Sequence, residues 1–371
     1  HGSTRAWADE NILNVSDIQK LYLKRLPVFI TATCDFSRFD DITTSAGEEL
    51  FLNAKGGGIA LFTTTRVVYS TDNFDINIEF IKYIFSRDQN GNRLRLGDII
   101  RLSKEKMSGD NRLKFVLLGD PALTLAYPEY SIRITEINNE SVSDVIPTIQ
   151  AKSRVLMKGE ILRPDGTEAD DFNGIVVSKI FDSPTQKITL DNNDRGYTFT
   201  YKDRTNVLYQ GKDSVRNGEF TFQFKVPKEI NYSYESGLIN LYAYDSNKQN
   251  AHEAQGAFDG FLVGGMDEDA EEDTEGPVIH GLYLNTRDFA NGDIVNETPT
   301  LIADIEDPSG FNISGSSIGH DITATIDDDP LQRYVVNNYY TSDFGQFGKG
   351  SVIYNMSEIT EGTHTLTFKV W

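Results

Sequence analysis

The residues most able to do chemistry are one cysteine and one histidine in the amino-terminal part of the sequence. Cys34 is the only cysteine among 371 residues, and His1 is the first residue. An imidazole can take the proton of a thiol and leave a thiolate, which is the nucleophile in covalent catalysis by cysteine. The pair therefore indicates nucleophilic catalysis. The competing interpretation is that Cys34 is a small buried apolar side chain.

The surroundings of Cys34 in the sequence favour a site at the end of a strand. An apolar run, residues 26–33, precedes it and is typical of a buried strand. The carboxyl ends of strands are where ligands and chemistry gather in open α/β sheets. Polar residues follow directly: Asp35, Ser37, Arg38, Asp40 and Asp41.

Strand and helix patterns alternate over the first third of the chain. Capping-box patterns at Ser16–Gln19 and Ser45–Glu48 predict two helix starts. A helix is predicted over 74–85 and another after residue 97. The first of these carries four apolar residues at helical spacing: Phe74, Ile78, Ile81 and Phe85. With further strands predicted at 59–63 and 113–118, this order predicts an α/β layer fold with a mostly parallel sheet over residues 1–128.

After residue 128 the pattern changes to an apolar period of two with turn residues between the runs. Phe220, Phe222 and Phe224 alternate with polar residues, and so do Leu301, Ala303 and Ile305. Two β-sandwich modules are predicted, over 129–265 and 276–371. An acidic linker over 266–275 is predicted to join them.

Composition excludes several classes of function. The net charge of −21 and the pI near 4.6 disfavour binding to nucleic acid or to an anionic membrane surface. A single cysteine excludes an internal disulfide. No apolar stretch reaches the roughly 20 residues that cross a bilayer.

The remaining polar clusters are weaker candidates. Acidic runs at 267–273 and 327–329 offer oxygen ligands that suit Ca²⁺ as a structural ion. Neither run has the spacing of a known calcium loop, so a solvated linker and an acidic turn are preferred. No cofactor is required by any motif. The other histidines (His252, His280, His320 and His364) are expected to be structural or exposed.

Several segments resemble the gingipain-type cysteine peptidases. The catalytic half is matched by His1-Gly-Ser with residues 6–9, by Thr31-Ala-Thr-Cys34-Asp-Phe-Ser with Asp40, and by residues 59–66 and 118–123. The later segments resemble the member that acts as C-terminal signal peptidase, or sortase, of the type IX secretion system. They are residues 256–265, 276–279, 319–321 and 326–327.

This resemblance implies a role for each matching residue. Cys34 would be the nucleophile, His1 the general base, and the backbone amides of Gly2 and Cys34 the oxyanion hole. The fold would be a caspase-like α/β domain followed by two immunoglobulin-like modules. The substrates would be secreted proteins with C-terminal sorting domains. A lipopolysaccharide amine would be the acceptor and an outer-membrane β-barrel protein the anchor, at the surface of a Gram-negative cell.

The resemblance also implies that the sequence is a fragment. The upstream half of the catalytic domain, with the acidic partner of His1, is expected before residue 1, and the second β-module is expected to continue beyond Trp371. Activity of this fragment alone is therefore in question. Two alternatives stay open: a non-catalytic surface or adhesion module on a degenerate peptidase scaffold, and a plain secreted gingipain-like protease that only hydrolyses.

Overall fold

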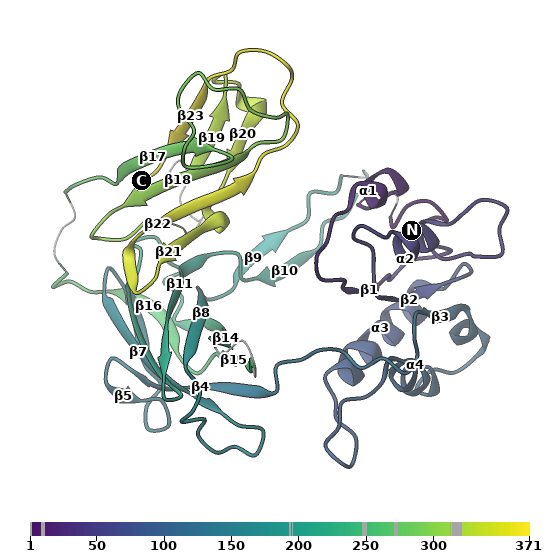
Figure 1. Cartoon of the computed structure of the whole chain (residues 1–371). Coiled ribbons are helices and arrows are strands. Elements are labelled where there is room, and N and C mark those ends of the chain that lie inside the picture. The colour runs from purple at the N-terminus through teal and green to yellow at the C-terminus, as the bar shows by residue number, and fades with distance from the viewer. Residues whose placement is uncertain are drawn as a thin grey trace. The chain divides into compact units, whose positions relative to one another are not determined.

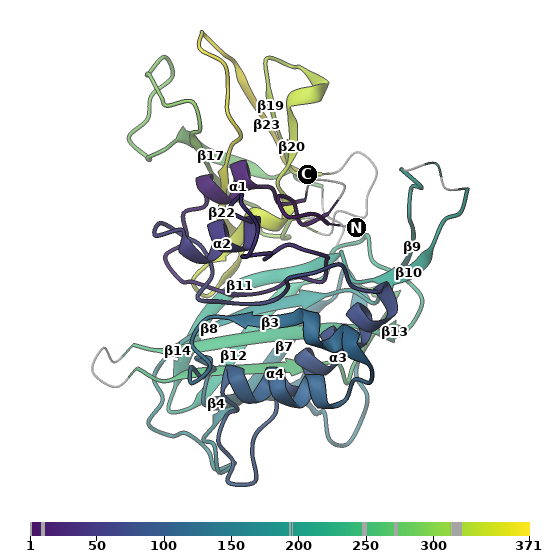
Figure 2. The same ribbon diagram turned by 90° about the vertical axis from the view of Figure 1, so that its right-hand side faces the viewer.

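The structure is a computed structural model that describes residues 2–8, 12–192, 194, 196–246, 251–270, 274–311, 313 and 321–371. The chain divides into two compact units, His1–Tyr127 and Pro128–Trp371 (Figures 1 and 2). Each unit has cores of its own, so the two are described separately.

The first unit is a small sheet with helices on both faces. Its elements in chain order are α1 (Val15–Lys20), β1 (Val28–Ile30), α2 (Ala46–Leu52), β2 (Ala60–Thr64), α3 (Ser70–Ile84), α4 (Leu96–Glu105), the 3₁₀ turn η1 (Asp110–Lys114) and β3 (Phe115–Leu118). The central strand β2 is fully buried. Leu61 packs against α1 and α2 on one face of the sheet, while Ala60 and Phe62 pack with α3 and α4 on the other.

Capping explains where the first two helices begin. The Ser45 side chain accepts the N–H of Glu48, whose carboxylate in turn accepts the N–H of Ser45, as the sequence predicts. The prediction for α1 is wrong by two residues. Its capping box pairs Asn14 with Asp17, and Ser16 lies inside the helix.

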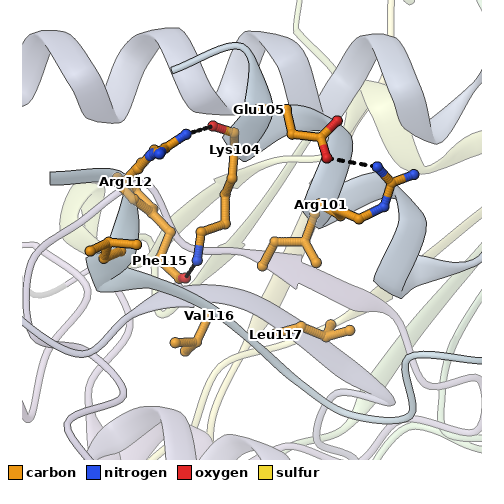
Figure 3. Close-up of a pocket in the computed structure, with 9 residues that line it drawn as sticks. Arg101, Lys104, Glu105, Arg112, Phe115, Val116 and Leu117 are labelled. Carbon is orange, nitrogen blue, oxygen red and sulfur yellow. Dashed lines mark hydrogen bonds and ion pairs between the residues drawn. The ribbon is translucent and has the colours of Figure 1, made fainter. Parts of the chain in front are cut away.

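Two further expectations for this unit need correction. The strand predicted over 26–33 is only Val28–Ile30, and the sheet is half parallel: β1 pairs with β2 parallel, but β3 pairs with β2 antiparallel. At the free side of β3, the Lys104 ammonium on α4 donates to the carbonyl of Phe115 at 2.9 Å (Figure 3).

Helix α3 does not bury the face that its spacing suggests. The four residues predicted to line its apolar face, Phe74, Ile78, Ile81 and Phe85, are exposed. Ile76, Phe80 and Ile84 are buried instead. The Phe80 ring stacks on Phe62 of β2 with a centroid distance of 4.6 Å, which fixes this face of the helix against the sheet.

The second unit begins with a sheet that closes on itself. Its strands are β4 (Tyr130–Ile137), β5 (Glu140–Ser141), β7 (Arg154–Leu162), β8 (Gly174–Phe181), β11 (Val207–Arg216), β12 (Glu219–Lys225), β14 (Leu238–Asp245) and β15 (Glu253–Phe258). Their order is β15-β14-β8-β11-β12-β7-β4-β5, and β15 also pairs with β4. The sequence predicts a β-sandwich here, and this stays a prediction. The closed sheet, called the barrel below, is joined by only two residue pairs between β15 and β4 and by two between β11 and β12.

The alternation of apolar and polar residues and the residues at the turns determine where the strands of this barrel lie in the sequence. Phe220, Phe222 and Phe224 on β12 all point into the core, as predicted. The hairpin from β11 to β12 turns at Asn217 and Gly218, whose φ values of 52° and 80° are those of a two-residue hairpin turn.

Two smaller sheets accompany the barrel. β6 (Thr148–Ala151), β13 (Glu235–Ser236) and β16 (Leu262–Met266) form one of them and contribute Ile149 and Val263 to the barrel core. The other is a hairpin of β9 (Thr185–Ile188) and β10 (Thr200–Asp203). The loop between these two strands carries exposed aromatic residues such as Phe199.

The last part of the second unit has two sheets around one core. The first is formed by β17 (Val278–Leu284), β18 (Thr300–Glu306), β22 (Gln346–Asn355) and β21 (Tyr340–Asp343), the second by β20 (Arg333–Val335), β19 (Thr323–Ile326) and β23 (Leu366–Lys369). Leu301, Ala303 and Ile305 on β18 are fully buried, as their alternation predicts. The 3₁₀ turns η2 (Pro330–Gln332) and η3 (Asn337–Tyr339) lie between the strands.

The two parts of the second unit touch along β11 and β21. Val207 of β11 belongs to the core of the last part. The hydroxyls of Tyr209 and Ser342 lie 3.4 Å apart, and the Gln210 amide donates to Thr341 at 3.3 Å. The predicted division at residues 266–275 stays a prediction.

Candidate active site

Cys34 lies in the first unit just beyond the carboxyl end of β1. The chain continues alongside β2 after the strand ends, with the N–H of Thr31 donating to the carbonyl of Phe62 at 2.9 Å. The Cys34 side chain is 8% exposed and belongs to the core that α3 and α4 form with the sheet. The sulfur is thus at the predicted end of the strand, on its buried side.

The cysteine sulfur contacts the backbone of Val68, a residue that sequence analysis missed. The N–H of Val68 donates to Sγ at 3.4 Å, and Sγ lies 3.5 Å from the carbonyl oxygen of the same residue. A thiol can donate to that carbonyl, whereas a thiolate can accept only from the N–H. Val68 therefore offers a partner to both protonation states of Cys34. Nothing in the sequence marks it except its position soon after β2.

The chain bends sharply directly after the cysteine. Asp35 has a φ of 54°, which is uncommon for any residue but glycine. Its N–H donates to the carbonyl of Arg66 at 3.4 Å. Non-glycine residues in this region carry a modest strain and are found at functional sites more often than elsewhere. After the bend the chain stays beside β2, with the N–H of Ser37 donating to the carbonyl of Thr64 at 3.0 Å.

Buried hydroxyl groups join the end of β1 to β2. Thr63 Oγ1 contacts Thr31 Oγ1 and Ser37 Oγ, each at 2.8 Å. The Thr64 hydroxyl donates to the carbonyl of Thr33 at 2.5 Å. These hydrogen bonds hold the residues on both sides of Cys34 in one arrangement.

Gly2 lies against the residue that precedes the cysteine. A Cβ added to Gly2 would lie 1.9 Å from Thr33 Oγ1 and 2.4 Å from the carbonyl oxygen of Trp7, so no larger residue fits here. Within the described residues, the amides of Gly2 and Cys34 donate no hydrogen bond. These are the two N–H groups that the resemblance assigns to an oxyanion hole. His1, the expected base, lies outside the described residues.

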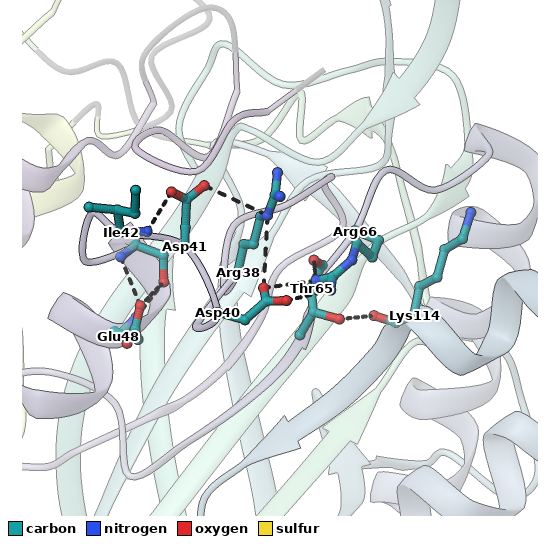
Figure 4. Close-up of polar contacts among 9 residues, drawn as sticks. Arg38, Asp40, Asp41, Ile42, Glu48, Thr65, Arg66 and Lys114 are labelled. Atoms are coloured by element: carbon teal, nitrogen blue, oxygen red, sulfur yellow. Dashed lines mark hydrogen bonds and ion pairs between the residues drawn. The ribbon is translucent and has the colours of Figure 1, made fainter.

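An ion pair ties the loop after Cys34 to the end of β2 (Figure 4). The Arg66 guanidinium donates to both carboxylate oxygens of Asp40, at 3.0 and 2.5 Å. This hydrogen bond and the charge of Arg66 hold the pKa of Asp40 below its usual value. Arg38 lies 3.8 Å from Asp40 and 3.7 Å from Asp41. The Arg66 contact links the loop to the chain after β2, and the Arg38 contacts lie within the loop.

Asp327 and three of the other histidines contact neighbouring side chains of the second unit. Asp327 accepts the N–H of Thr365 and pairs with His364 at 2.7 Å, which raises the pKa of that histidine. His280 pairs with Glu306 at 2.8 Å, and His252 stacks on Tyr130. In the part of the chain that the structure describes, no three His, Cys, Asp or Glu side chains are arranged to hold a metal. Residues 271–273 and His320 lie outside that part, so calcium binding stays a prediction.

No helix in the described ranges is both long and apolar enough to span a membrane.

Comparison with known proteins identifies the first unit. Residues 1–126 match the model of peptidase family C25. The chain is similar to dimeric latent PorU from Porphyromonas gingivalis, with 33% identity over 85% of this chain and 30% of that chain and a TM-score of 0.42. It is also similar to the Arg-specific cysteine proteinase gingipain R, with 14% identity over 71% and 51% of the two chains and a TM-score of 0.31.

This chain therefore spans less than a third of the length of PorU. No curated protein matches it. The family match covers the strand that leads to Cys34, the bend at Asp35 and the Val68 backbone beside the sulfur. Residues 1–126 of this chain belong to peptidase family C25, the gingipain family of cysteine peptidases.

Proposed function

We propose that this chain carries the nucleophile of a cysteine endopeptidase and transpeptidase of the type IX secretion system. Its substrates would be secreted proteins, from which it removes C-terminal sorting domains. The observation that supports this most is the position of Cys34 in the C25 segment. Its sulfur lies 3.4 Å from a backbone amide, Gly2 lies against Thr33, and the amides of Gly2 and Cys34 donate no hydrogen bond to any described residue.

The proposed reaction assigns a step to each residue. His1 takes the proton of the Cys34 thiol, and Sγ attacks the carbonyl carbon of the scissile peptide bond. The Gly2 and Cys34 amides stabilise the oxyanion that forms. His1 then gives the proton to the departing amine, which leaves an acyl-thioester on Cys34. Val68 would donate to the thiolate before attack.

The second half of the reaction decides between two products. An amine of anionic lipopolysaccharide attacks the thioester carbonyl and releases Cys34 with a new amide on the cargo. Water would give a free carboxylate instead. The acceptor places the protein at the outer-membrane surface of a Gram-negative cell, held there by a β-barrel partner. No cofactor enters either step, and Ca²⁺ would be a structural ion only.

The proposal includes the finer fold of both units. Helices on both faces of the β1-β2-β3 sheet support part of a caspase-like domain. Two sheets around one core support an immunoglobulin-like module in residues 276–371. An immunoglobulin-like module is proposed for residues 129–265 as well, where β4 pairs antiparallel with β7 and, over two residues, parallel with β15.

Replacing the sulfur tests the proposed nucleophile. In the full-length protein, Cys34→Ala is expected to abolish cleavage of a cargo that carries its C-terminal sorting domain, and iodoacetamide is expected to label Cys34 and inactivate the wild type. Cleavage is followed by gel and the products by mass spectrometry. Lys82→Gln, at an exposed partner of Glu79 on α3, is a control that leaves Cys34 and its neighbours unchanged. Cleavage by the Cys34→Ala variant would sink the assignment.

One observation favours a second candidate function. Cys34 is 8% exposed, as expected for a structural cysteine on a non-catalytic scaffold that acts through protein contacts. The rate of iodoacetamide alkylation against pH separates the two. A catalytic thiolate reacts well below pH 8.5, approximately the ordinary thiol pKa, whereas a structural thiol stays inert at every pH. If the protein is active, an amine adduct on the product distinguishes transfer from plain hydrolysis.

A further inference from the structure

A pocket at the free edge of the first unit's sheet is not used by the proposed reaction. It has a volume of about 480 Å³ and lies between α4 and β3 (Figure 3). Ligand pockets in proteins typically span about 300–1,000 Å³. Its lining residues are Ile100, Arg101, Lys104, Glu105, Arg112, Leu113 and residues 115–117.

The floor of this pocket is apolar. Ile100 comes from α4, and Val116 and Leu117 come from β3. Leu113, at the end of η1, is 63% exposed beside them. Apolar side chains along an uncovered strand edge are the usual mark of a surface that another chain can join.

The rim is basic, although the chain as a whole carries a charge of −21. Glu105, its one carboxylate, is already paired with Arg101 at 2.7 Å. Lys104 donates to the carbonyl of Phe115, and Arg112 donates to the carbonyls of Lys104 and Met107. Burial and the charge of Arg112 together lower the pKa of Lys104. Two neighbouring cations thus have carbonyl oxygens as partners and no carboxylate among the described residues.

The backbone of β3 is open on the same side. Among the described strands it pairs only with β2, where the N–H of Thr65 donates to the carbonyl of Lys114 and Val116 lies opposite Thr63. Because antiparallel pairing alternates along a strand, the N–H and C=O groups of Phe115 and Leu117 turn to the other side. Arg112 and Lys104 satisfy those of Phe115. The pair on Leu117 faces the pocket edge.

We propose that this groove binds an extended acidic segment of a partner protein. The segment adds as a strand at Leu117 and places a carboxylate between Lys104 and Arg112. Its acidic side chains share the face of α4, and its apolar side chains, which alternate with them, cover Val116 on the opposite face of the sheet. Backbone hydrogen bonds then give affinity, and the two cations select for negative charge. The Lys104 ammonium leaves the Phe115 carbonyl and moves to the incoming carboxylate, so this lysine closes the edge until the segment arrives.

Fluorescence anisotropy with the whole chain tests the proposal. The probe is a fluorescein-labelled peptide of alternating glutamate and valine, and its control has glutamine in place of glutamate. Saturable binding of the glutamate peptide is expected, with about tenfold weaker binding of the glutamine peptide. Raising the salt from about 0.05 to about 0.5 M should weaken the first and leave the second unchanged. Absence of saturable binding, or equal binding of both peptides, overturns the proposal.

Two variant pairs separate charge from backbone pairing. Lys104→Met with Arg112→Gln should abolish the preference for glutamate, whereas Lys82→Gln on α3, an exposed partner of Glu79, should not. Leu117→Pro removes the outward N–H without breaking the bond pattern to β2, and Leu117→Ala keeps that N–H. Binding is expected to be lost in the proline variant and retained in the alanine variant.

Circular dichroism and the Tm of each variant show whether it folds. If the proline variant does not fold, the Lys104→Met, Arg112→Gln variant alone tests the proposal. Neither of these two residues lies within a strand. Sedimentation without peptide identifies the other occupant. A dimer of the chain that Leu117→Pro dissociates would mean that a second copy fills the groove, and the proposal of a separate acidic partner would be wrong.

Discussion

Helix α3 and strand β12 both carry apolar residues at regular spacing, but they bury them differently. On β12, Phe220, Phe222 and Phe224 are buried and every residue between them is exposed. On α3, apolar residues occupy two faces, of which the one with Ile76, Phe80 and Ile84 is buried. A strand with one apolar face has only one way to pack. A helix with two apolar faces can pack in two ways, and contacts with neighbouring elements determine which face is buried.

The largest loss of unfolding free energy is expected for a substitution on β12, where its side chains pack into the barrel core. Phe224→Ala should cost about 3–5 kcal/mol of unfolding free energy, because the ring is 1% exposed and stacks on Tyr209 at 5.0 Å. Phe199→Ala, at a position 64% exposed, should change stability by less than about 0.5 kcal/mol. Urea unfolding measures both. Similar losses in the two variants would break the contrast between buried and exposed phenylalanines in this unit.

A matched pair on α3 sharpens the comparison for the helix. Ile76→Ala should cost about 2–5 kcal/mol, because Ile76 is fully buried against the sheet. Ile81→Ala makes the same chemical change at a side chain 50% exposed and should cost less than about 0.5 kcal/mol beyond helix propensity. The measurement is again chemical unfolding. A large loss for Ile81→Ala would mean that the outer face of α3 is packed as well.

The smallest change in stability is expected from the titration of Asp213, a carboxyl on β11, the strand beside β12. Burial raises the pKa of Asp213 to about 6. The folded protein therefore binds this proton more tightly than the unfolded chain, whose aspartates titrate near about 3.9. Stability from this group is present below that value and is lost as the pH rises through about 6.

Asp213→Asn removes this titration. The variant should match the wild type in Tm at about pH 4 and exceed it above about pH 7, with the difference growing between these values. Scanning calorimetry across this range measures it. A difference in Tm that stays constant with pH would contradict the raised pKa.

Local patterns predict much of this fold. The strands with period-two alternation, the capping box at Ser45 and the position of Cys34 after a strand all depend on neighbouring residues. The start of α1 is mispredicted because Asn14 and Ser16 are both good N-caps, and only the geometry selects Asn14. The antiparallel direction of β3 and the closure of the barrel depend on partners far along the chain, which no local pattern reveals.

The candidate site divides in the same way. The position of Cys34 after the end of a strand could be predicted from the sequence. Gly2, which lies against Thr33, could also be singled out there. Val68 could not, because its contribution is a backbone N–H that any residue except proline would supply. Arg66 and Asp40 are ordinary charged residues in sequence, and only the fold brings them together.

Closure of the barrel has a consequence for how the protein is made. The final parallel pairing joins Tyr130 and Ser131 to Ala254 and Gln255. The first strand, β4, therefore cannot complete its pairing until β15 has been synthesised. A ribosome adds roughly 5–20 residues per second, and long-range pairings of this kind fold slowly. During that interval the edge of β4 that later pairs with β15 is open to other nascent chains. We therefore expect this segment, more than the α/β unit that emerges before it, to depend on chaperones.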